Sequence, residues 1–169
     1  MHAQREMIRH MLATLAFRTQ KALGGADDRF PDFSAGDGAR TPTELIRQMS
    51  SALGYARTFF IGCVYEAAPL PSFLEEVQRF YALLADLSDH LAAGTDVHGI
   101  TLHQLLQGPL SDAMTHAGQL AMLRGLAGSL VDPENLVFAE ISIDNLDSGR
   151  SSPNAPGAVS SRKRKRFGL

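Results

Sequence analysis

Residues 41–59 read TPTELIRQMSSALGYARTF, and this stretch carries the clearest helix-start signal in the chain. Thr41 is suited to be an N-cap, Pro42 fits the first helical position, and Glu44 completes a capping box. Beyond this start, a candidate apolar stripe recurs at steps of three and four residues: Leu45, Gln48, Ala52, Tyr55 and Phe59. We therefore expect an amphipathic helix whose inward face includes the Gln48 side chain.

The same periodicity predicts three further helices, which span about residues 4–23, 73–92 and 101–126. Ser72 and Thr101 are suited to cap the last two. Helices that each carry one apolar stripe must bury it against one another, and hardly any segment alternates as a strand would. The sequence therefore predicts an all-α fold, with a four-helix bundle as its architecture.

Three local features modify this simple picture. Gly108-Pro109 should kink the fourth helix, because proline lacks the N–H that the helix needs. Residues 133–143 alternate weakly and favour an extended C-terminal segment along the bundle. Cys63 is expected to be a buried structural thiol rather than a nucleophile, because no histidine lies near it in the sequence.

Length and composition suit one soluble domain of ordinary type. The chain has 169 residues, which is enough to bury a single core without disulfides or metals as staples. Its single cysteine cannot form an intramolecular disulfide, which favours a reducing compartment. No stretch approaches the roughly 18 apolar residues that a spanning helix requires. We therefore expect a cytoplasmic protein with no membrane partner.

Charge divides the chain into two parts. The formal net charge is −2, yet residues 162–166 read RKRKR, and the rest of the chain has 11 basic and 18 acidic residues, a net charge of −7. Residues 148–161 are rich in Ser, Pro, Asn and Gly, a composition typical of disorder. We therefore expect a folded domain over residues 1–145 and a disordered basic tail over residues 146–169. An acidic body argues against nucleic-acid binding, except non-specifically through the tail.

Asp112 and His116 form the most informative polar pair. Four residues apart on a predicted helix, they share one face, and Ala113 and Leu120 suggest that this face looks inward. An inward carboxylate and imidazole either coordinate a divalent ion or satisfy each other as a hydrogen-bonded pair. An inward Gln48 likewise either bonds a neighbouring helix or offers an oxygen ligand. Spacing alone leaves both alternatives open.

Two segments resemble a known family. TPTELIRQM at residues 41–49 is similar to the second-helix motif of the DinB/YfiT-like superfamily, and THAGQLAML at residues 115–123 is similar to its fourth-helix motif of histidine, small residue, Gly and Gln. The resemblance covers about residues 3–145. It implies a left-handed four-helix bundle, often a homodimer, with a divalent metal on three histidines, one from the second helix and two from the fourth.

Carried over by position, the resemblance implies a metal site made of Gln48, Asp112 and His116. Only His116 keeps the family's histidine, so the implied site is open and weak, and suits nickel, zinc or manganese rather than a structural zinc. Binding would weaken as the imidazole protonates, around pH 6.5 for an ordinary histidine. The implied activity is a thiol-dependent transferase-like reaction on an unidentified small molecule. The alternative is a non-catalytic ligand-binding or stress-associated bundle with a degenerate site.

Overall fold

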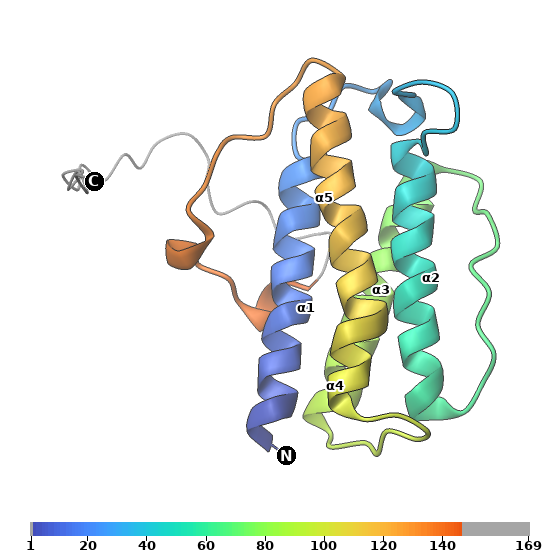
Figure 1. Ribbon diagram of the computed structural model, residues 1–169, viewed down its shortest axis with the longest axis vertical. Helices are drawn as coiled ribbons and strands as arrows, with labels where there is room; N and C mark the ends of the chain where they lie inside the picture. Colours follow the sequence, from blue (N-terminus) through green and yellow to red (C-terminus); the bar gives the residue numbers. More distant parts are fainter. Residues whose placement is uncertain (1, 147–169) are drawn as a thin grey trace.

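The computed structural model describes residues 2–146, and its long elements are all helices (Figure 1). They are α1 (His2–Leu23), α2 (Pro42–Ile61), α3 (Phe73–Ala92), the short α4 (Leu102–Leu105) and α5 (Ser111–Leu126). Within residues 2–146 there is no strand, which confirms the all-α class. Residues 147–169, which include the predicted tail, lie outside the described part.

The long helices α1, α2, α3 and α5 form a bundle in which α2 and α3 run in the same direction. Arg47 pairs with Glu76 and Arg57 pairs with Asp86, and the partners in both pairs are 29 positions apart. A constant offset means that the two helices are parallel. The crossover, residues 62–72, therefore returns along the bundle to its starting end, as Figure 1 shows beside α2.

The first helix, α1, closes the bundle against α3 and α5. Its Arg5 side chain donates to the Thr95 carbonyl just after the end of α3, so α1 and α3 are antiparallel. At its other end, the carbonyl of Ala22 accepts a hydrogen bond from Arg124 near the end of α5. Because α2 also packs on α3 and α5, each long helix has two neighbours around a shared core.

Local capping fixes where the helices begin. The Thr41 hydroxyl accepts from the Glu44 N–H at 3.2 Å, and the Glu44 carboxylate accepts from the Thr41 N–H at 2.8 Å, so the predicted capping box is confirmed. Thr101 caps α4 with a capping box of the same kind, and the Ser72 hydroxyl caps α3 by accepting from the Glu75 N–H, so both predicted caps are confirmed. These caps satisfy N–H groups that have no partner within the helix.

The buried face of α2 differs from the predicted one. Leu45 and Ala52 are buried, but Gln48 and Tyr55 are exposed. The neighbouring positions are buried instead: Ile46, Met49, Leu53, Ala56 and Phe60. The expectation that Gln48 faces the core was therefore wrong, because α3 and α5 cover an arc of α2 that is rotated by about one residue.

The Gly108-Pro109 break appears as a π-helical turn, Leu106–Leu110, between α4 and α5. Proline cannot donate to the residue four positions earlier, so the chain takes a wider turn. Ser111 satisfies the Leu106 carbonyl there through its hydroxyl, at 2.7 Å. The helical path thus continues from Leu102 to Leu126, and the turn ends at Leu110, two residues before Asp112.

Two other expectations need correction. Cys63 is exposed rather than buried, since it lies just after the end of α2, where the crossover begins. The segment predicted to be extended, residues 133–143, includes the 3₁₀ turn Leu136–Phe138 and leads into a second, Ile143–Asn145. No helix within residues 2–146 is both long and apolar enough to cross a bilayer.

The crossover is fixed to the bundle at two places. The buried Glu76 carboxylate accepts from Arg47 Nε at 2.8 Å and from the Leu70 N–H at 2.9 Å, and it also pairs with Arg79. Arg79 in turn donates to the Ala68 carbonyl at 2.6 Å. The second place is near the start of the crossover, where the Tyr65 ring packs against Gly54 of α2. A Cβ atom added to Gly54 would lie 2.0 Å from the nearest atom of this ring.

Candidate functional site

Helix α5 brings Asp112 and His116 together as the sequence predicts. His116 Nε2 lies 3.6 Å from Asp112 Oδ2. His116 is buried, with 8% of its surface exposed, whereas the Asp112 side chain is 60% exposed. The inward orientation is therefore right for the imidazole and wrong for the carboxylate. The pair lies at the edge of the bundle, where one group touches the core and the other meets solvent.

Gln119 contacts the other ring nitrogen of His116. Its amide oxygen Oε1 lies 2.9 Å from His116 Nδ1. When Nδ1 carries the ring proton, it donates to this oxygen, because an amide oxygen only accepts. In neutral His116, Nε2 is then a bare lone pair facing the Asp112 carboxylate. Two acceptors at 3.6 Å need a proton or a cation between them, and a histidine held by its other N–H is typical of metal ligands.

Gln48, the third predicted site residue, is not joined to this pair. It lies on the exposed face of α2, and no hydrogen bond or ion pair in the described structure links its side chain to Asp112 or His116. Across residues 2–146, no three His, Cys, Asp or Glu side chains gather closely enough to hold a metal ion. Two of the three predicted residues therefore meet.

A second carboxylate–histidine pair on α3 was missed by the sequence reasoning. His90 Nε2 lies 3.6 Å from Asp86 Oδ2, and its ring stacks on Phe60 with centroids 5.4 Å apart. The four-residue spacing was a signal that could have found it. Here, however, Arg57 also pairs with Asp86. Asp86 thus has a permanent cationic partner, whereas no arginine or lysine of residues 2–146 pairs with Asp112.

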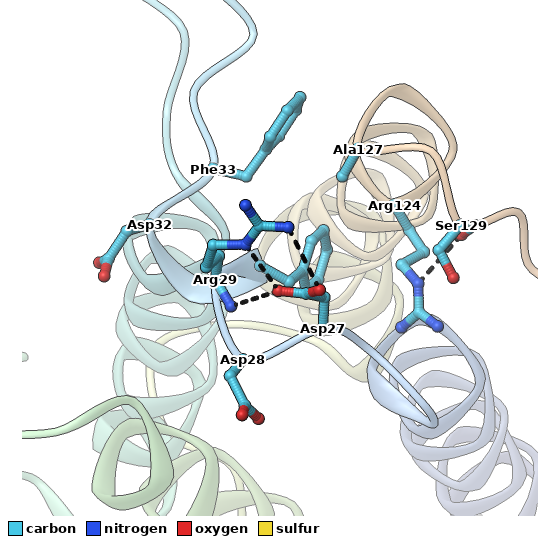
Figure 2. Close-up of a pocket in the computed structure, with 9 residues that line it drawn as sticks. Asp27, Asp28, Arg29, Asp32, Phe33, Arg124, Ala127 and Ser129 are labelled. Carbon is cyan, nitrogen blue, oxygen red and sulfur yellow. Dashed lines mark hydrogen bonds and ion pairs between the residues drawn. The ribbon is translucent and has the colours of Figure 1, made fainter.

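A cavity of about 570 Å³ lies away from these pairs (Figure 2). It is formed by the loop between α1 and α2 and by the C-terminal end of α5. Its lining includes Phe30, Phe33 and Arg124 but none of the three predicted site residues. The clustered acids and aromatics of DDRFPDF, residues 27–33, were a partial signal, but only the fold brings them to α5.

Comparison with known proteins adds no assignment. No protein-family model matches the chain, and neither a curated protein nor a solved structure matches it. The function of the chain is therefore inferred from the geometry of the site.

Proposed function

We propose that this chain is a DinB-like bundle that binds a divalent cation weakly through Asp112 and His116. One observation carries the proposal: Nε2 of the buried His116 lies 3.6 Å from Asp112 Oδ2, while Nδ1 of the same ring lies 2.9 Å from Gln119 Oε1, which orients the imidazole. The left-handed bundle and the homodimer implied by the family resemblance belong to the same proposal, as does the cytoplasmic location expected from the single cysteine.

The donor set suits a borderline cation with several waters. Imidazole nitrogen and carboxylate oxygen together fit nickel, zinc or manganese, with water in the remaining coordination positions. A coordinated cation lowers the pKa of a bound thiol or water. The enzymatic form of the proposal is therefore a thiol-dependent transferase-like reaction, in which Asp112 and His116 hold the ion. Gln48, on the exposed face of α2, has no part in it.

The alternative is a non-catalytic ligand-binding bundle in which the pair only stabilises α5. The observation that favours it is the equal 3.6 Å separation in the Asp86–His90 pair, which already has Arg57 as its cation. A carboxylate and a histidine four residues apart also form a common helix-surface pair. The two candidates therefore differ in metal binding and in turnover.

Titration calorimetry of the tag-free chain with nickel, zinc and manganese tests the proposal. We expect weak binding that falls as the pH is lowered, because a proton competes for Nε2. His116→Gln and Asp112→Asn should abolish it, and Gln119→Ala should weaken it about tenfold by releasing the ring. The matched control is the double variant Asp86→Asn/His90→Gln, which should bind as the native chain does.

The outcomes separate the candidates. Absence of binding, or binding that survives both His116→Gln and Asp112→Asn, would end the metal proposal. Nanomolar zinc binding would show that a ligand is missing from the set. Metal-dependent turnover of a small thiol with an electrophile, lost in His116→Gln, would support the enzyme. Metal binding without turnover would support the non-catalytic alternative.

A further inference from the structure

The crossover between α2 and α3 is anchored unevenly along its length. The Gly62 N–H donates to the Thr58 carbonyl at the end of α2, and residues 68–70 bond to charged side chains of α3. Between these ends, residues 63–67, which we call the strap, make no hydrogen bond within residues 2–146. The strap is therefore held on the bundle by the packing of its Tyr65 ring.

The Tyr65 ring closes over the seam between α2 and α3. It packs against Gly54 of α2, where any side chain larger than that of glycine would collide with it. Burial raises the pKa of the Tyr65 phenol, and the charges that act on this group are those of Arg79, Glu76 and Arg57. These three side chains come from both helices, and the hydroxyl oxygen itself is buried. The hydroxyl therefore lies at the seam and not in solvent.

Three buried polar atoms at this seam have no hydrogen-bond partner within residues 2–146: the Tyr65 hydroxyl, the Ser50 hydroxyl and Arg79 Nε. The ion pairs between α2 and α3 join residues 29 positions apart, and the same offset places Ser50 opposite Arg79. All three atoms therefore lie at one level of the seam. A buried polar group without a partner has lost its hydration without replacement, so this packing is unfavourable for all three.

We propose that the strap is releasable: its Tyr65 ring leaves Gly54 and returns while the bundle stays folded and residues 68–70 stay bound to α3. Release hydrates the unpartnered polar atoms, which offsets part of the packing that the ring loses. Gly62, with φ 68° at the end of α2, can absorb the backbone change as a hinge. This inference does not depend on the proposed metal site.

Chymotrypsin cleavage after residue 65 measures the release, because the ring must leave Gly54 to enter the binding pocket of the protease. At low protease concentration the cleavage rate follows the population of the released form. Tyr65→Phe keeps a cleavable ring but removes the unpartnered hydroxyl. We therefore expect cleavage to slow about fivefold, after correction for the rates of peptides of residues 61–70 with either ring.

Tyr81→Phe is the matched control for this variant. It also removes a buried hydroxyl without a partner, but Tyr81 lies two positions after Arg79, which turns it about 200° around α3 and away from the seam. The cleavage rate after Tyr65 should then change by less than about twofold.

A second variant leaves the cleavage site untouched. Ser50→Ala removes another of the unpartnered hydroxyls, and it should slow cleavage after Tyr65 about threefold. Ser51→Ala is its control, because Ser51 is the half-buried neighbour on the same helix and its hydroxyl is not among the unpartnered atoms. The control should cleave as the native chain does.

Urea separates release of the strap from unfolding of the bundle, because the urea dependence grows with the surface that is exposed. Slower cleavage in both Tyr65→Phe and Ser50→Ala, with a shallower urea dependence after Tyr65 than after Tyr81, supports the proposal. Equal or faster cleavage in either variant overturns it, because that hydroxyl would then have a partner such as an ordered water. An equally steep urea dependence at both sites also overturns it, because release would then require unfolding of the whole bundle.

Discussion

Glu76 has no exposed surface, yet it is surrounded by groups that stabilise its negative charge. Burial alone would raise the pKa of its carboxyl. Hydrogen bonds from the Leu70 N–H and Arg47, with the positive charge of Arg79, outweigh burial and place the pKa below its ordinary 4.5. The same carboxylate contacts α2, α3 and the crossover, so one residue joins three parts of the bundle.

Glu76→Gln should lower the free energy of unfolding by about 2 kcal/mol, because it removes charge-assisted hydrogen bonds and leaves two half-buried arginines unpaired. Urea unfolding monitored by circular dichroism measures this loss. Glu66→Gln is the control, since Glu66 is exposed in the same crossover. An equal loss in both variants would contradict a specific role for Glu76.

The stability gap between the native chain and Glu76→Gln should depend on pH. A carboxyl whose pKa is lower in the folded state stabilises that state above its unfolded pKa, and the contribution is lost as pH falls through the folded pKa. We therefore expect a constant gap near neutral pH that shrinks below about 4.5. Urea midpoints across this range test it, and a gap that widens in acid would mean that the charge destabilises the fold.

At the scale of one helix, the positions where helices begin could be predicted from the sequence more accurately than the faces that they bury. Each helix start is set by a contact between the capping residue and the residue three positions later, so the local sequence was sufficient to predict it. The capping residues are Thr41, Ser72 and Thr101. The buried face of α2 depends on how α3 and α5 pack on it. Two adjacent apolar stripes fit its sequence, and the prediction followed the one containing Gln48.

The candidate sites show the same difference between contacts within one helix and contacts between distant segments. The meeting of Asp112 and His116 was predictable because both lie within one helical turn. The position of Gln48 and the cavity near Arg124 could not be predicted, because each depends on contacts between segments far apart in the chain. The handedness of the bundle and the metal remain predictions.

Gly54→Ala should loosen the crossover although alanine favours helices. A Cβ there would sit 2.0 Å from the Tyr65 ring, so the ring must leave its place on α2. We expect faster proteolysis between residues 62 and 72 and a lower melting temperature. Gly118→Ala in α5, where a Cβ meets nothing within 4 Å, is the matched control and should stabilise by up to about 1 kcal/mol. Stabilisation by both would show that Tyr65 adapts freely.

At the scale of the whole molecule, the parallel pair α2 and α3 makes the crossover part of the architecture. Two parallel neighbours require a connection that spans the bundle, and Arg79, Glu76 and Tyr65 fix this one to the helices. The described core draws on residues from Ile8 to Leu146. The long helices and that core therefore form one unit over residues 2–146.

Deleting residues 148–169 should leave helix content and melting temperature nearly unchanged, because the described helices and core are formed by residues before them. The deletion also removes the five positive charges of residues 162–166. Any retention on DNA should then disappear, and in the full chain it should weaken steeply with salt. Circular dichroism and DNA-column retention measure the two effects. Retention by the shortened chain would reveal a basic surface on the bundle.

The Arg124 contacts also set an order in time. The last carbonyls of α1 accept hydrogen bonds from a side chain about 100 residues later, and α1 packs on α3 and α5. During synthesis α1 leaves the ribosome before α5, so the carbonyls at its end find their Arg124 donor only after α5 has been made. Helices α2 and α3 can pair earlier, and a nascent chain that stalls before Arg124 exposes the apolar side of α1 to chaperones and proteases.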